Sequence, residues 1–353
     1  MQLFNGKYKL EERLGQGASA EVWKATDTLT DTTLALKIYS PTNGMGTNGY
    51  QMLAHEFKIM VSANHQNLLK PLHFDIDENR PFLVLTYCEK GNIDKFRGTL
   101  SVKQAWKLLK DVAGGLAYLH DMKPPLIHQD IKPANILIDD NDNFVLTDFG
   151  VSAHAKAQLH QNGKRGELKS AGTIAYMPPE KFRSDSSPIM KNDIWSLGAT
   201  VYEMITNDLP FGNDGGLSQT PSTQMPDMPA SIPPTLSGTI LKCLSYHPWD
   251  RPDAKEIYEI ATKELERMEV EETKVYSTKP SDSAHTPTPT PIPIPDPIHG
   301  STSETMQDPI SDQITDSPHA YFPDPAKPTI SIAVMAVTAA AGLVIGILLA
   351  III

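Results

Sequence analysis

The sequence is poor in cysteine. Among its 353 residues only Cys88 and Cys243 are cysteines, and they lie far apart and outside any metal-ligand spacing. Disulfide frameworks and zinc sites need several closely spaced cysteines, so the sequence offers neither. We interpret both thiols as reduced and buried in a cytosolic domain.

The chain also lacks an excess of positive charge. Its formal net charge is −11, and no long basic stretch could follow a phosphate backbone. Proteins that bind nucleic acids cluster Lys and Arg side chains against the phosphates, so we expect no nucleic-acid partner. The first residues, Met1–Lys7, contain no apolar core, and we therefore expect no signal peptide there.

Aromatic residues are almost absent from residues 273–329, which are rich in Pro, Ser, Thr and Asp. Proline occupies alternate positions from Pro287 to Pro295, which disfavours helix and central strand and favours polyproline II. Too few apolar side chains are present to offset the entropy of ordering the segment. We predict a disordered linker that spans about 45 Å as a flexible coil. Its Thr-Pro pairs are alternatively phosphorylation sites.

One long apolar run does occur, at residues 330–353, and it contains neither charge nor proline. As a helix it would be about 36 Å long, against roughly 30 Å of bilayer hydrocarbon. A buried core helix is the alternative, but we predict a single transmembrane helix in contact with membrane lipid. Gly342 and Gly346, together with Thr338 and Ala350, form a smooth face that permits a homodimer, although small residues are common in membrane helices.

Residues 1–272 are predicted to form the globular part, since a hydrophobic content of 40% is enough for a core. Apolar patterning predicts strands first and mostly helices later. The expected strands are 8–10, 21–25, 34–39 and 81–87, and the expected helices are 51–63, 105–120, 192–206 and 253–271. Leu53, Phe57 and Met60 share one face of the first helix, and Ser101 with Gln104 forms a capping box before the second. The fold class is therefore α+β, with a strand-rich lobe, a helix-rich lobe and a cleft between them.

A glycine-rich turn lies between the first two expected strands, where residues 15–22 read Gly-Gln-Gly-Ala-Ser-Ala-Glu-Val. Glycine lets backbone N–H groups approach polyphosphate without Cβ obstruction. Because a strand follows, the turn is neither a P-loop nor a Rossmann turn, both of which open a helix.

Lys37 lies in an otherwise apolar strand and needs an anionic partner. Nucleotide phosphates can supply one, and so can Glu56 on the expected helix. The alternatives are an edge-strand solubilising charge for Lys37 and a solvated helix face for Glu56.

The strongest chemical signal is His-Gln-Asp-Ile-Lys-Pro-Ala-Asn at residues 128–135, followed by Asp148-Phe149-Gly150. It places Asp130 beside Lys132 and Asn135, then adds the carboxylate of Asp148 at the start of a turn. Such groups orient a hydroxyl nucleophile, neutralise a transferring phosphoryl group and hold Mg²⁺.

The order of these motifs resembles that of the eukaryotic-type serine/threonine protein kinases over about residues 1–270. Residues 172–180 resemble the end of an activation segment, and residues 193–198 resemble the helix that braces the catalytic loop. Arg251 is placed like the arginine that pairs with a glutamate, here Glu180. A two-lobed protein kinase fold follows from the resemblance, and the compact head and single span look like bacterial, membrane-anchored members.

The resemblance implies ATP and Mg²⁺ as cofactors and protein Ser/Thr hydroxyls as substrates. Asp130 would accept or orient the substrate proton, Lys132 would sit beside the γ-phosphate, and Asn135 and Asp148 would hold two Mg²⁺ ions. Glu56 would position Lys37 on the α/β-phosphates. The implied nucleotide contacts are Leu14, Gly15, Gln16, Gly17, Ala18, Val22, Ala35, Lys37, Leu85 and the hinge Thr86-Tyr87-Cys88. Lys132 and Thr173 match the Ser/Thr-specific class.

Four features depart from the family pattern. Ala20 replaces the third glycine of the loop, which is mild because alanine still allows a tight turn. Gln129 stands where most such kinases have arginine, and Pro178 replaces the alanine before Pro179. Residues 212–234 are rich in Gly, Pro, Ser and Thr where the family has a helix near its substrate-docking surface. We expect that helix to be missing or shortened.

We therefore expect a single-pass membrane protein with a cytoplasmic Ser/Thr kinase domain that acts in signalling and autophosphorylates. A pseudokinase scaffold is one alternative, but it predicts loss of Lys37, Asp130 or Asp148, and all three are present. A small-molecule kinase is another, and the match through Glu180 argues against it.

Overall fold

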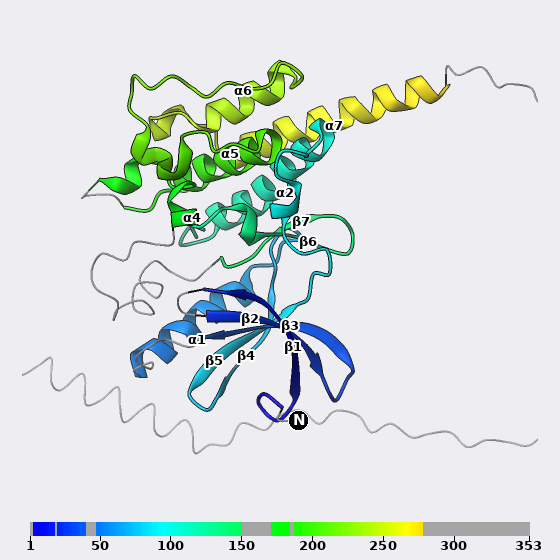
Figure 1. The fold of residues 1–353 in the computed structure, drawn as a ribbon, viewed down its shortest axis with the longest axis vertical. Helices are drawn as coiled ribbons and strands as arrows, with labels where there is room; N and C mark the ends of the chain where they lie inside the picture. The colour runs from blue at the N-terminus through cyan, green and yellow to red at the C-terminus, as the bar shows by residue number, and fades with distance from the viewer. Residues whose placement is uncertain (1–2, 18–19, 40–46, 150–170, 184–186, 278–353) are drawn as a thin grey trace, which may run out of the picture. The chain divides into compact units, whose positions relative to one another are not determined.

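A five-stranded antiparallel sheet forms the N-terminal lobe (Figure 1). The computed structural model describes residues 3–17, 20–39, 47–149, 171–183 and 187–277, all within one compact unit, Met1–Asp282. The strand order is β1-β2-β3-β5-β4. The strands are β1 Tyr8–Gln16, β2 Ala20–Asp27, β3 Thr32–Tyr39, β4 Pro71–Asp77 and β5 Arg80–Thr86.

The two faces of this sheet belong to different cores because side chains alternate along a strand. On β3, Leu34, Leu36 and Ile38 belong to a small buried cluster with Phe4 and Phe82. Ala35 and Tyr39 point the other way and join the main core, which also contains Leu53 and Met60 of helix α1, Thr47–Ser62. The predicted apolar face of this helix is confirmed, although the helix starts earlier than expected.

Helices dominate the C-terminal lobe (Figure 1). The longer ones are α2 Val102–Asp121, α5 Met190–Thr206, α6 Pro234–Cys243 and α7 Ala254–Ser277. The capping box of Ser101 and Gln104 is present at the start of α2, as predicted. Glycine at 198 lets α5 approach α6 closely, because a Cβ there would lie 2.7 Å from Cβ of Cys243. The predicted order of a strand-rich lobe before a helix-rich lobe is confirmed.

Short elements complete this lobe. They are the two-stranded sheet of β6 Ile136–Ile138 and β7 Phe144–Leu146, helix α4 Ala171–Ile174, and the 3-10 helices η1 Ile93–Phe96, η2 Pro133–Asn135, η3 Pro179–Phe182, η4 Gly212–Ser218 and η5 Pro248–Asp250. Within residues 212–234, the helical structure before α6 begins at Pro234 is η4, which consists of two short 3-10 segments separated by a kink at Gly215. The expected helix near the substrate-docking surface is therefore short.

The C-terminal boundary of the globular part differs from the prediction. Helix α7 continues past residue 272 to Ser277, so the first residues of the predicted linker are helical. Among the described helices, none is both long enough and apolar enough to cross a membrane. The rest of the linker and the predicted span at 330–353 lie outside the described residues.

Candidate active site

A buried aspartate on α5 fixes the loop that precedes Asp130. The backbone N–H groups of His128 and Gln129 donate to the carboxylate oxygens of Asp193 at 2.9 and 2.7 Å. Nε2 of His120 lies 2.9 Å from the same carboxylate. Gln129 has a φ of 65°, a left-handed conformation that is uncommon outside glycine and costs free energy. Asp193 therefore holds this loop in a strained backbone conformation, as the brace predicted for residues 193–198.

The side chain of Asp130 is held by two neighbours from its own loop. Nζ of Lys132 lies 3.2 Å from Oδ2 of Asp130, and Nδ2 of Asn135 donates to the same oxygen at 3.0 Å and to the backbone oxygen at 2.8 Å. Nζ of Lys132 also donates to Oγ1 of Thr173 at 3.0 Å. The expected contact of Thr173 with the catalytic loop is thus present, and it links α4 to this cluster.

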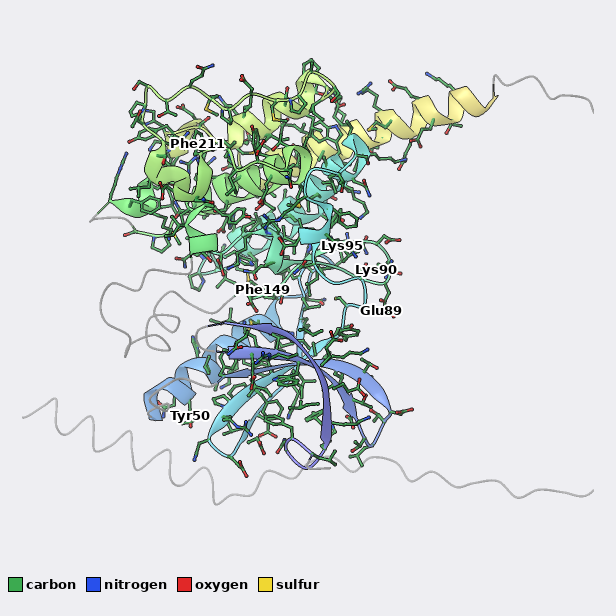
Figure 2. All side chains as sticks on the ribbon, viewed as in Figure 1. Tyr50, Glu89, Lys90, Lys95, Phe149 and Phe211 are labelled. Atoms are coloured by element: carbon green, nitrogen blue, oxygen red, sulfur yellow. The ribbon has the colours of Figure 1, made fainter. Side chains whose placement is uncertain are left out.

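Asp148 lies two residues after β7, the second strand of the β6–β7 hairpin. Its φ of 64° is again left-handed. Nε2 of His128 lies 3.0 Å from the backbone oxygen of Thr147, which ties the residue before Asp148 to the loop of Asp130. Phe149 is fully buried and lies where the two lobes meet (Figure 2). The His128–Thr147 hydrogen bond therefore links the two loops that carry Asp130 and Asp148.

Lys37 reaches Asp148 from the other lobe, and its Nζ lies 2.6 Å from Oδ1. The Lys37 side chain is 13% exposed. Burial opposes its positive charge and lowers the pKa, but the charge and hydrogen bond of Asp148, together with the charge of Asp130, outweigh burial and hold the pKa above its usual value. Lys37 is therefore charged and anchored. The backbone of Glu56 lies in α1 as predicted, but its side chain is outside the described residues.

The predicted nucleotide contacts of the sheet share one of its faces. Val22 is paired with Lys37, and Ala35 is paired with Leu85, so each pair has its side chains on one side. Ala35 and Lys37 are two residues apart on β3 and point the same way. Val22, Ala35 and Leu85 thus lie on the same face of the sheet as Lys37, while Leu14 on β1 is 43% exposed.

The glycine-rich turn has room that the described residues do not fill. Among those residues, a Cβ built at Gly15 meets no atom within 4 Å, and one at Gly17 meets only Ala20 O at 3.5 Å. Gly17 N–H donates to that same oxygen at 2.8 Å and closes the turn. Neither glycine is needed for the packing of the chain. This open space suits the close approach of a ligand. Gln16 ends β1, and Ala18 lies outside the described residues.

The predicted hinge follows β5 and connects the two lobes. Thr86 is exposed, Tyr87 is half-buried with Nζ of Lys24 5.1 Å from its ring centroid, and Cys88 is buried. The carbonyl of Cys88 accepts a hydrogen bond from the Gly91 N–H at 3.0 Å. Figure 2 shows Glu89 and Lys90 on the same connection.

The oxygen donors present suit a magnesium ion that arrives with a nucleotide. Because Nδ2 of Asn135 is bound to Asp130, its amide oxygen is the atom able to bind a cation. Together with Asp148 this provides two hard oxygen ligands, and Mg²⁺ is usually held by one or two carboxylates plus phosphates and water. Within the described part of the chain, no group of three or more His, Cys, Asp or Glu side chains could hold a metal by itself.

Two further contacts involve residues of the 3-10 helix η3. Arg251 binds Glu180 through two bonds, at 2.6 and 2.9 Å, and its side chain is fully buried, so the predicted pairing is confirmed. Lys181, the next residue, donates from Nζ to Oε1 of Gln129 at 3.0 Å. No local sequence pattern predicts this second contact, because the two residues are far apart in the chain.

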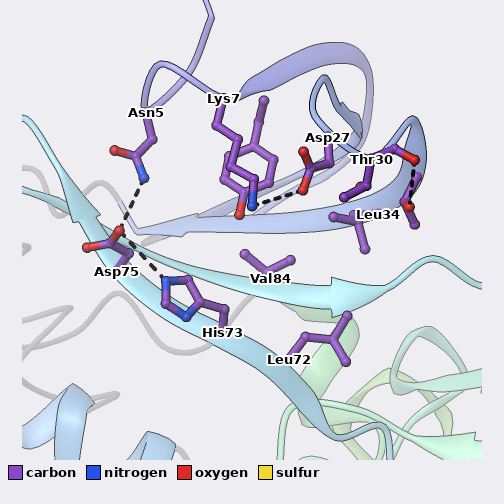
Figure 3. A pocket seen from close by; sticks show the side chains of 11 residues that line it. Asn5, Lys7, Asp27, Thr30, Leu34, Leu72, His73, Asp75 and Val84 are labelled. Carbon is purple, nitrogen blue, oxygen red and sulfur yellow. Dashed lines mark hydrogen bonds and ion pairs between the residues drawn. The ribbon is translucent and has the colours of Figure 1, made fainter. Parts of the chain in front are cut away.

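A separate pocket of about 370 Å³ lies on the opposite face of the sheet. Figure 3 shows its polar rim, where Lys7 pairs with Asp27 at 2.9 Å and His73 lies 3.8 Å from Asp75. Its apolar floor includes Val84 of the smaller core. The lining shares no residue with the cluster around Asp130, so this pocket is not part of the candidate site.

Known proteins resemble the chain over its globular part. Residues 8–261 match the protein kinase domain family. The serine/threonine-protein kinases tousled-like 2 of Mus musculus and Homo sapiens are each 30% identical to the chain over 278 residues, covering 72% of this chain and 39% and 36% of their own lengths. Serine/threonine-protein kinase TOUSLED of Arabidopsis thaliana is 29% identical over 270 residues, covering 71% of this chain and 39% of its own length. The chain thus spans about two fifths of the length of these relatives.

Proposed function

Because the chain belongs to the protein kinase family, we propose that it transfers the γ-phosphoryl group of ATP to Ser and Thr hydroxyls of proteins. One observation carries the proposal. Asp130, Lys132 and Asn135 form one hydrogen-bonded cluster, and the Lys37–Asp148 ion pair joins the sheet lobe to the helical lobe beside it. These are the groups that phosphoryl transfer requires.

Each residue has a distinct proposed role. Bound ATP would supply the phosphoryl group, and Mg²⁺ would neutralise the negative charge that develops on it. The carboxylate of Asp130 orients the substrate hydroxyl and accepts its proton, while the ammonium of Lys132 lies close enough to stabilise negative charge on the transferring group. The oxygens of Asn135 and Asp148 would hold Mg²⁺, and Lys37 would bind the remaining phosphates.

The contact between Lys132 and Thr173 supports specificity for Ser and Thr. The hydroxyl of Thr173 accepts a hydrogen bond from the Lys132 ammonium and so fixes the Lys132 side chain beside Asp130. The relatives named above are serine/threonine kinases, which agrees with this reading.

Phosphoamino-acid analysis tests this function. The full chain is incubated with ATP labelled at the γ position, Mg²⁺ and a mixture of peptides that carry Ser, Thr or Tyr. We expect label on phosphoserine and phosphothreonine, in the peptides and in the chain itself. Nucleotide binding without any transfer would instead favour a scaffold, and label confined to small molecules would contradict a protein substrate.

We also propose that a membrane helix at 330–353 tethers the kinase domain, with the domain in the cytoplasm where ATP is present. The support comes from the sequence, because this run is uncharged and long enough to span a bilayer. We propose a bacterial member of the kinase family because of the order of kinase domain, linker and membrane helix. We propose a homodimer because Gly342 and Gly346 lie on one smooth face of that helix.

Fractionation tests the tether. The full chain should stay in the membrane pellet after a high-salt wash, and residues 1–329 alone should be recovered in the supernatant with kinase activity intact. Recovery of the 1–329 chain in the washed pellet would contradict the assignment. Crosslinking of Gly342→Leu and Gly346→Leu variants checks the dimer face, since larger residues should abolish the crosslinked pair.

A further inference from the structure

An aromatic ring lies against the ammonium of Lys37. Tyr39 is two residues further along β3, so the two side chains leave the strand on the same face. Nζ of Lys37 lies 5.7 Å from the centroid of the Tyr39 ring. A cation within about 6 Å of a ring centroid is attracted by the negative face of the ring.

The ring is fixed and shielded from water. Tyr39 is 2% exposed and belongs to the main core together with Leu53 and Met60 of α1. On the sheet it is paired with Ala20, the first residue of β2 and part of the glycine-rich turn. A cation–ring attraction is stronger at such a desolvated position than on a surface. The Tyr39 ring is therefore placed to attract the Lys37 ammonium, in addition to filling space in the core.

Two contacts of different kinds converge on one ammonium group. An oxygen of Asp148 lies 2.6 Å from Nζ, and the Tyr39 ring faces the same atom from the sheet lobe. Asp148 is also a residue that would hold Mg²⁺, and its hold on Lys37 would then weaken. The Tyr39 ring would not bind the metal, so it offers Lys37 a support independent of Asp148.

We propose that Tyr39 is a positioning residue, which keeps the Lys37 ammonium directed toward the nucleotide phosphates. The inference rests on the proposed function, because it assumes that Lys37 contacts those phosphates. The inference adds a support for Lys37 from a residue of the same strand. A second support is expected from Glu56 on α1.

Nucleotide affinities separate positioning from a purely structural role. Mg-ADP carries phosphates and adenosine does not. Substituting a residue that acts through Lys37 should therefore weaken the binding of Mg-ADP and leave the binding of adenosine unchanged. Dissociation constants for both ligands are measured by calorimetry with the full chain and with the variants Tyr39→Phe, Tyr39→Leu and Lys37→Met. Thermal unfolding of each variant confirms that it folds, and Tyr39→Met replaces the leucine variant if that one does not.

We expect Tyr39→Leu to weaken Mg-ADP binding about three- to tenfold, as loss of a desolvated cation–ring contact implies, and to leave adenosine binding within about twofold. Tyr39→Phe keeps the ring and should behave like the wild type. In the Lys37→Met background, Tyr39→Leu should cause no further loss of Mg-ADP affinity.

Four outcomes would overturn the inference. An equal loss of affinity for both ligands in Tyr39→Leu would indicate a packing role and would leave the proposed function intact. An equal loss of Mg-ADP affinity in Tyr39→Phe, or a full further loss in the Lys37→Met background, also refutes it. A wild-type chain that binds neither ligand refutes the proposed function together with the inference.

Discussion

Lys181 donates a hydrogen bond from Nζ to Oε1 of Gln129, over 3.0 Å, next to the aspartate expected to act on the substrate. In kinases with arginine at the position of Gln129, that arginine pairs with a phosphate on the activation segment. Glutamine cannot make a charged bidentate contact, which is the basis of such pairing. Here its amide oxygen is already occupied by a lysine from η3.

We therefore predict that phosphorylation of the activation segment changes the kinase activity of this chain only weakly. The variant with Ser152→Ala and Ser170→Ala should keep activity within a few-fold of the wild type. Both serines lie in residues 150–170, outside the described part, where Lys156, Lys164, Arg165 and Lys169 offer other cations. Initial rates of peptide phosphorylation with phosphatase-treated and untreated enzyme test this, and a loss of tenfold or more on treatment would sink the hypothesis.

The hydroxyl of Thr173 is predicted to matter whether or not it is modified. It accepts a hydrogen bond from Lys132, which in turn contacts Asp130. Thr173→Ala should lower kcat at least tenfold, because both side chains lose their fixed geometry. Thr173→Ser keeps the hydroxyl and serves as the matched control. Equal activity of the two variants would show that the hydrogen bond is dispensable.

The buried pair of Glu180 and Arg251 is predicted to support the stability of the domain. Removing one partner leaves a buried charge without compensation, which typically costs about 3–5 kcal/mol. Arg251→Met should lower the free energy of unfolding, measured by urea denaturation, by about this amount. Arg267→Met removes a half-exposed arginine that pairs with Glu264 at 2.9 Å, and this control should change stability little. Similar losses in the two variants would contradict the assignment.

The thiol of Cys88 is predicted to resist alkylation. Burial, with a smaller contribution from Asp139 and Asp140, raises its pKa to about 11. The thiolate is the reactive form, so iodoacetamide should label Cys88 slowly at neutral pH and faster as the pH rises toward that value. Cys243, whose pKa burial raises to about 12, should behave alike. Mass spectrometry of native and urea-unfolded protein measures both sites, and rapid native labelling of Cys88 at pH 7 would refute the assignment.

Sequence patterns predicted the elements whose signals are local. The capping box at Ser101 and the apolar face of α1 depend on residues three or four apart, and both are present in the structure. Motif order also brought Asp130, Lys132 and Asn135 into one cluster, since they share a loop. The contact of Lys132 with Thr173 was expected only through the family resemblance.

Other features had no local signal. The short strands β6 and β7 are only three residues each, too short for a period to emerge, and the start of α6 follows a proline-rich stretch that reads as a loop. The pairing of Lys181 with Gln129 joins residues that only the fold brings together. Tyr39 could have been found, because strand alternation places it on the same face as Lys37.

The most direct test of the central claim compares the wild type with Asp130→Asn in peptide phosphorylation at saturating ATP and Mg²⁺. The substitution keeps the size of the side chain but removes the group that accepts the proton, so both proteins should fold and bind Mg-ADP alike. We predict that kcat falls by roughly 10²–10⁴-fold, the usual range for loss of a general base. A rate for Asp130→Asn within a few-fold of the wild type would show that phosphoryl transfer does not depend on this cluster.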